Sequence, residues 1–86
     1  MKINTNVKNE YITKDFYITA ILIASKKLHL VRLEKGNGKI VTFILNDPRL
    51  EAESIIRSHW DRKNKIVSLD IIEAINTLKT RMYNGI

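Results

Sequence analysis

Few side chains in this sequence could act as nucleophiles, proton-transfer groups or metal ligands, and their spacing suits none of these roles. The 86 residues contain two histidines and no cysteine. His29 and His59 fall in different predicted elements, and neither has a carboxylate at a ligand spacing. Ser58 and His59 are neighbours in a predicted helix, so their side chains face different directions. The segment 36–38, Gly-Asn-Gly, lacks the pattern of a phosphate-binding loop before a helix. We therefore predict no metal, no cofactor and no enzymatic activity.

Positive charge is the chemistry that the sequence does offer. The chain has 15 Lys and Arg against 9 Asp and Glu, a net charge of +6. Residues 1–45 hold eight basic and three acidic side chains, a net of +5, whereas residues 46–86 have a net of +1. A concentrated positive field attracts phosphates or acidic proteins, although solvated surface lysines are an alternative explanation. The candidate phosphate-contacting residues are Lys26, Lys27, Arg32, Lys35, Lys39, Arg62, Lys63 and Lys65.

Binding of single-stranded nucleic acid would also require exposed aromatic side chains on which bases can stack. Tyr11, Tyr17 and Phe43 are the candidates nearest the basic half of the chain. Tyr17 and Phe43 lie in apolar contexts that favour the core. We therefore predict Tyr11 as the stacking residue.

A β-hairpin over about 28–45 would position most of the basic residues. Two strands, 28–34 and 39–45, are joined through Lys35-Gly36-Asn37-Gly38, where the glycines supply the positive φ of a tight reversal. A four-residue loop pairs Glu34 with Lys39 and Leu30 with Phe43. One face then carries Leu28, Leu30, Val41, Phe43 and Leu45 together with Arg32, and the other carries His29, Val31, Leu33, Ile40, Thr42 and Ile44.

Both predicted faces of this hairpin are apolar, and a hairpin alone is marginal in water. Either the rest of the chain or a partner must cover them, and the sequence does not decide which face is buried. Arg32 is a lone charge on its face, so it must sit at an edge, pair with a carboxylate or meet a partner. An isologous homodimer is one way to bury the surplus apolar surface.

Three helices are predicted, over about 14–26, 47–60 and 69–83. Their start signals are Thr13 with Asp15, then Asn46-Asp47-Pro48, then Ser68. The first helix is apolar nearly all round, which is typical of a central core helix or an interface. The inner stripe of the second comprises Ala52, Ile55, Ile56, His59 and Trp60, and that of the third comprises Ile71, Ile75, Leu78 and Met82, widened by Ile72.

These elements predict an α+β fold, a small antiparallel sheet built on the hairpin and packed by the three helices. Residues 11–86 form one domain after a flexible N-terminal arm over residues 1–10, with candidate short strands at 10–12 and 66–67. The longest apolar stretch, 16–24, is too short to span a membrane, and the N-terminus does not resemble a signal peptide. We expect a cytoplasmic protein with no membrane partner.

Three short stretches carry a family resemblance: Thr13-Lys14-Asp15-Phe16 leading into Ala20 and Leu22, Val41-Thr42-Phe43-Ile44 followed by Asp47, and residues 74–79 with Tyr83. On these, the region 11–83 resembles an uncharacterised family of small phage and mobile-element proteins, a domain of unknown function. Asn76 stands where similar proteins often carry a basic residue. The resemblance lends no catalytic residues. It implies a setting in which small basic proteins handle DNA or bind host machinery.

The predicted function is thus that of a small, basic, non-enzymatic nucleic-acid-binding accessory protein of phage or mobile-element type. The alternative is a protein-binding adaptor or inhibitor that docks on an acidic host or replication protein. The sequence leaves open DNA or RNA and single strand or duplex.

Overall fold

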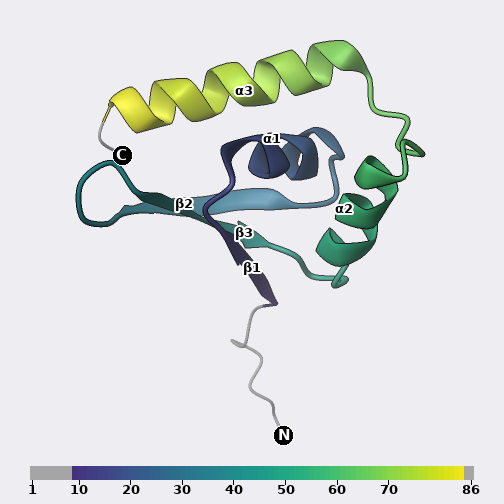
Figure 1. Cartoon of the computed structure of the whole chain (residues 1–86), viewed down its shortest axis with the longest axis horizontal. Coiled ribbons are helices and arrows are strands. Elements are labelled where there is room, and N and C mark those ends of the chain that lie inside the picture. The colour runs from purple at the N-terminus through teal and green to yellow at the C-terminus, as the bar shows by residue number, and fades with distance from the viewer. Residues whose placement is uncertain (1–8, 85–86) are drawn as a thin grey trace, which may run out of the picture.

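A computed structural model describes residues 9–84 and confirms the α+β fold (Figure 1). The elements are β1 (Glu10–Thr13), α1 (Phe16–Ala24), β2 (His29–Lys35), β3 (Val41–Asn46), α2 (Ala52–Trp60) and α3 (Ser68–Tyr83). The candidate short strand at 10–12 is confirmed as β1, and the predicted arm over residues 1–10 is too long because Glu10 belongs to the sheet. Residues 1–8 of that arm lie outside the described residues.

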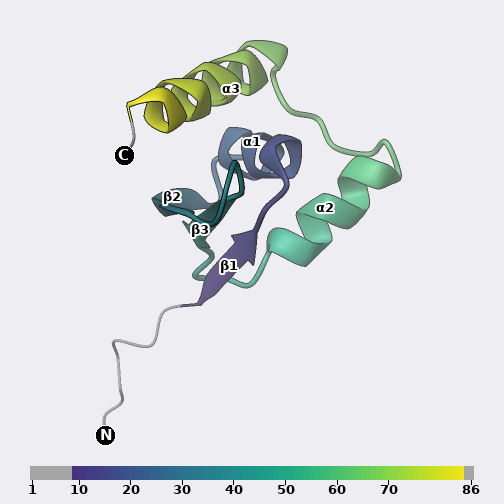
Figure 2. The same cartoon turned by 60° about the vertical axis from the view of Figure 1, so that its left-hand side comes forward.

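The sheet is antiparallel in the order β1-β3-β2, and the helices gather on one of its faces (Figures 1 and 2). α1 lies directly on the sheet, α3 crosses above α1, and α2 lies beside them. Within residues 9–84, no helix covers the opposite face of the sheet. The helices therefore do not enclose the hairpin from both sides.

The core surrounds α1, as its all-round apolar sequence predicts. Ala20, Leu22 and Ala24 are almost fully buried, between the sheet on one side and α3 on the other. The partners buried with them are Leu28, Leu33, Phe43, Leu45, Ala52, Ala74 and Leu78. The chain thus covers α1 without a second protomer, and the homodimer stays a prediction.

The register of the hairpin differs from the predicted one. Leu33 pairs with Phe43 and Lys35 pairs with Val41, across a longer loop closed by a 2.8 Å hydrogen bond from Gly36 N to Ile40 O. The register also shifts between Leu30 and Arg32, leaving Val31 as the extra residue of a bulge. A bulge reverses the alternation of side chains beyond it. Leu33 therefore faces the core, and Arg32 turns to the face without helices.

α1 begins later than predicted because its cap is Asp15 rather than Thr13. The Asp15 carboxylate accepts a hydrogen bond from Ile18 N at 3.0 Å, and the Thr13 hydroxyl accepts one from Asp15 N at 3.1 Å. The helix ends at Ala24, and Lys26 leaves it with a left-handed φ of 68°. The predicted range of 14–26 is thus too long at both ends.

α2 begins at Ala52 rather than at residue 47. The buried Asp47 side chain accepts hydrogen bonds from Glu51 N at 2.8 Å and Ala52 N at 3.0 Å, so it satisfies helix amides across a turn. His59 is half-buried as predicted, but Trp60 is 68% exposed and does not belong to the inner stripe. Asp47 therefore does stabilise the start of this helix, but the helix begins five residues after it, which the sequence alone does not reveal.

α3 begins without a side-chain cap, so the prediction that Ser68 caps it is wrong. Residues 66–67 form no strand. Leu78 is fully buried and Ile71, Ile75 and Met82 pack against the core, which confirms the predicted stripe. Ile72 is 53% exposed and does not widen it.

Candidate functional site

Arg32, the lone charge of the hairpin, is paired. Its Nε donates to Glu34 Oε2 at 2.9 Å, and its Nη1 lies 3.8 Å from Glu10 Oε2. The hydrogen bond to Glu34 raises the pKa of the Arg32 guanidinium. Two carboxylates thus surround one guanidinium, and this face of the sheet does not offer Arg32 as a free phosphate contact.

The pairing also explains how Ile44 is buried on the face without helices. Glu10 belongs to β1 and Arg32 to β2, and β3 runs between them. To reach Glu10, the Arg32 side chain must cross β3 where Ile44 points outward. Ile44 is only 1% exposed. Ile44 lies between its register partners Ile12 and Arg32, and an arginine can cover an apolar neighbour with its aliphatic stem while its charged end reaches a carboxylate.

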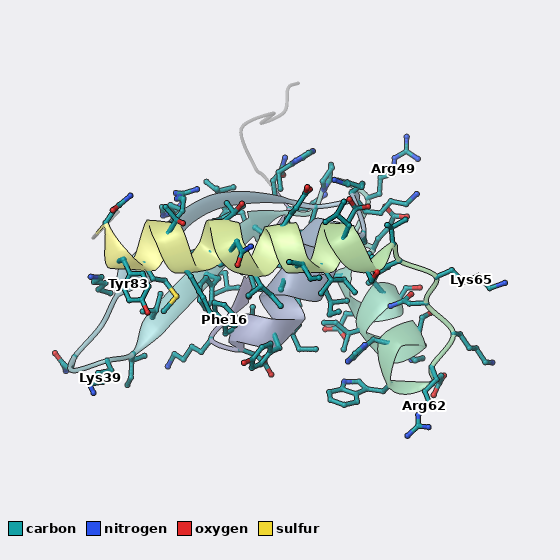
Figure 3. The ribbon with its side chains drawn as sticks, turned by 90° about the horizontal axis from the view of Figure 1, so that it is seen from above. Phe16, Lys39, Arg49, Arg62, Lys65 and Tyr83 are labelled. Atoms are coloured by element: carbon teal, nitrogen blue, oxygen red, sulfur yellow. The ribbon has the colours of Figure 1, made fainter. Side chains whose placement is uncertain are left out.

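The other predicted basic residues do not form one surface. Lys26 lies at the end of α1, where its Nζ is 3.7 Å from Asp70 Oδ1, and Lys27 is exposed beside it. Arg62, Lys63 and Lys65 are exposed in the loop between α2 and α3. Figure 3 shows Arg62 and Lys65 at the opposite end of the molecule from Lys39.

Tyr11 is half-buried and packs against the core. Burial and the nearby carboxylates of Glu53 and Asp15 raise the pKa of the Tyr11 phenol. A half-buried ring offers little of its face to a base. The nearby carboxylates would also repel the negative phosphate attached to that base. The structure therefore gives no support to Tyr11 as the stacking residue.

Two hollows meet at the C-terminal end of α3, and Met82 and Tyr83 line both. The first has a volume of about 360 Å³ and is lined by Phe16, Tyr17, Lys79, Met82 and Tyr83. The second has a volume of about 320 Å³ and is lined by Lys35, Gly38, Lys39, Ile40, Val41, Met82 and Tyr83. We call this continuous region the tip surface. Figure 3 shows Phe16, Tyr83 and Lys39 on the same side of α3.

Aromatic and basic side chains lie together on the tip surface. Tyr17 is 68% exposed and Tyr83 is 86% exposed, so the prediction that Tyr17 lies in the core is wrong. Phe16 holds Tyr17 in an edge-to-face contact, with ring centroids 5.1 Å apart. Among the residues that the structure describes, no carboxylate lines either hollow.

Tyr83 and Lys79 were absent from the predicted site, although the sequence holds a signal for them. Both fall outside the apolar stripe of the last helix and are four residues apart. Residues at this spacing lie on the same helix face. An aromatic and a basic side chain on a solvent face are candidates for a shared binding surface.

Two other regions are weaker candidates. Trp60 is 68% exposed beside the Arg62 loop, but Asp61 stands between them in sequence and is also exposed. A hollow of about 440 Å³ along α3 is lined by Arg81 and by uncharged polar side chains, with no aromatic group among its described lining. Neither combines several lysines with aromatic rings from different elements.

Within residues 9–84, no group of three metal-ligating side chains comes together, and no helix is both long and apolar enough to cross a bilayer. Comparison with protein-family models, with curated proteins and with solved structures returns no match for this chain. The resemblance to phage and mobile-element proteins therefore stays a prediction.

Proposed function

We propose that the protein is a non-enzymatic nucleic-acid-binding accessory protein that contacts phosphates through the tip surface. The observation that supports this is the convergence of Lys35 and Lys39 from the hairpin with Lys79 from α3 around two hollows whose described lining holds no carboxylate. All three lysines are exposed. Lysine binds phosphate as a point charge, so the contact positions the strand without reading its sequence.

The proposal predicts weak, salt-dependent binding. Neutralising three phosphates releases their counterions, which gives a slope of log affinity against log salt of about −2 to −3. The measurement is fluorescence anisotropy of labelled DNA and RNA, single-stranded and duplex, titrated with protein over a series of salt concentrations. Absence of salt-dependent binding to every one of these probes would overturn the proposal.

A charge-matched pair of variants locates the surface. Each double variant removes two exposed positive charges, and the two pairs come from opposite ends of the molecule. The first is Lys35→Ala/Lys39→Ala, and the second is Arg62→Ala/Lys65→Ala. The first should weaken binding and flatten the salt slope by about one to two units, similarly for all sequences. The second should change binding little.

Equal losses for the two variants would mean that net charge, rather than the tip surface, attracts the nucleic acid. A loss confined to Arg62→Ala/Lys65→Ala would move the site to the loop between α2 and α3. Circular dichroism of both variants should match the parent, since all four side chains are exposed.

The second candidate is an adaptor that docks on an acidic protein. It is favoured by the apolar part of the same surface, where Ile40 is 50% exposed beside Tyr83 and Met82. Affinity capture with and without nuclease separates the two functions. Partners that persist after nuclease treatment favour the adaptor, and partners that disappear favour nucleic acid.

A further inference from the structure

Two of the aromatic rings on the tip surface, those of Tyr17 and Tyr83, lie mostly in solvent. Tyr83 is 86% exposed and Tyr17 is 68% exposed, while Phe16 beneath them is half-buried and reaches Phe43 in the core. Phe16 thus connects Tyr17 to the core, and Tyr83 projects from the end of α3 into solvent. An exposed aromatic ring offers its flat face to a ligand with a matching flat face.

The arrangement places a positive charge next to each part of this aromatic surface. Lys79 shares the first hollow with Tyr17 and Tyr83, and Lys35 and Lys39 share the second with Tyr83. Lys79 and Tyr83 are on the same face of α3 because they are four residues apart. A nucleotide presents the same combination, a flat base joined to a negative phosphate.

Resting on the proposed function, we propose that the tip surface binds single-stranded nucleic acid by stacking an unpaired base on Tyr83, with Tyr17 as a second stacking ring. In a duplex, the faces of the bases are covered by their neighbours, so a surface tyrosine can reach them only if the base is extruded. In a single strand, the faces are accessible to exposed aromatic side chains. Phosphate contacts alone would not distinguish these ligands.

The test compares probes with the same phosphates and different bases. A labelled single strand of about 12 nucleotides, within the site sizes typical of such surfaces, is compared with the same strand carrying abasic sites at its central positions and with its duplex. The intact strand should bind on the order of tenfold more tightly than the abasic strand, the loss expected for one stacked base. The duplex should also bind more weakly than the intact strand.

Variants of Tyr83 then assign the stacking. Tyr83→Leu should lower affinity for the intact strand on the order of tenfold and leave affinity for the abasic strand unchanged. Tyr83→Phe keeps the ring and should retain the affinity of the parent. Trp60→Leu removes a mostly exposed aromatic group at the end of α2, near Arg62 and far from the tip surface, and should have no effect.

The outcomes separate this inference from the proposed function. If the intact and abasic strands bind equally and Tyr83→Leu changes neither, stacking is overturned while salt-dependent binding through the tip lysines stands. If Trp60→Leu alone weakens the intact strand, the stacking site lies at the opposite end and the inference is overturned. If no probe binds, the proposed function and this inference fall together, and the exposed rings are left for a protein partner.

Discussion

The tyrosines of this chain have the same chemistry and different environments. Tyr17 and Tyr83 are mostly exposed at one end of the molecule, whereas Tyr11 is half-buried near Glu53 and Asp15. Burial disfavours the charged phenolate, and the nearby carboxylates disfavour it further. At neutral pH the Tyr11 phenol is therefore firmly protonated, and its role is packing.

This environment predicts an alkaline dependence of stability. The folded pKa of Tyr11 is raised above the ordinary value of 10.0, so the folded state binds this proton more tightly than the unfolded state does. The stability that the folded state gains from holding this proton is fully present below pH 10.0, the ordinary pKa. It is lost as the pH rises through the folded pKa of Tyr11. Tyr11→Phe removes this dependence, so the variant should become more stable relative to the parent as the pH rises above about 10.

The measurement is the free energy of urea unfolding of both proteins over a pH series from neutral to alkaline. Tyr17→Phe, which alters a mostly exposed ring, is the matched control. A difference between Tyr11→Phe and the parent that stays constant throughout the series would contradict the assignment.

At the scale of elements, the hairpin depends on one glycine more than on the other. Gly38 has a φ of +67°, a left-handed conformation that strains any residue with a Cβ. Gly36 is free of this constraint, and an added Cβ would meet only Ile40, at an ordinary contact distance of 3.7 Å. The two glycines of the same loop are therefore not equivalent.

Alanine substitutions should separate them. Gly38→Ala should lower the free energy of unfolding by about 1–2 kcal/mol, the penalty of a left-handed residue with a side chain. Gly36→Ala should be neutral or raise it by up to about 1 kcal/mol, because alanine restricts the unfolded chain. Urea unfolding of both variants gives the comparison. A similar loss for both would contradict the observed loop conformation.

The existence of these elements could be predicted because their signals are local. Hydrophobic periodicity marks the three helices, and the glycines mark the reversal of the hairpin. The bulge at Val31 could not be predicted, because the run Leu30-Val31-Arg32-Leu33 offers apolar residues to the core in either register. Burial of Leu33 in the core, opposite Phe43 on β3, decides between them, and that burial depends on residues far away in the sequence.

The same reasoning applies to the candidate site. The sequence identifies every basic residue and places Glu34 two positions from Arg32, but the second carboxylate that pairs with Arg32, Glu10, reaches it only through the order of the strands. The importance of Lys79 and Tyr83 depends on the hairpin tip lying beside the end of α3. The sequence therefore identifies the basic and aromatic residues, but which of them lie together depends on the fold.

At the scale of the whole molecule, the sheet and α3 both depend on α1 for their packing. It lies between the sheet and α3, and Leu22 at its centre is fully buried. Loss of a side chain there removes contacts in the middle of the structure. The sheet and α3 should therefore lose stability together.

Leu22→Ala tests this dependence. It should lower the free energy of unfolding by about 2–5 kcal/mol, as core leucine truncations do. Hydrogen exchange of the slowest amides should accelerate by similar factors in β3 and α3. Ile72→Ala, which shortens an exposed side chain on α3, should change both little. Acceleration confined to α3 would show that the sheet is stable without α1.

The strand order β1-β3-β2 has a consequence for the sequence of events during folding. β2 and β3 are joined by a short loop and can pair within microseconds, as hairpins do. β1 pairs with the other side of β3, so bringing Tyr11 to Leu45 closes a loop that contains α1 and β2. Closing that longer loop restricts more of the chain. We expect β1 to join the sheet last, and the Arg32 bridge to Glu10 to form only in this final step.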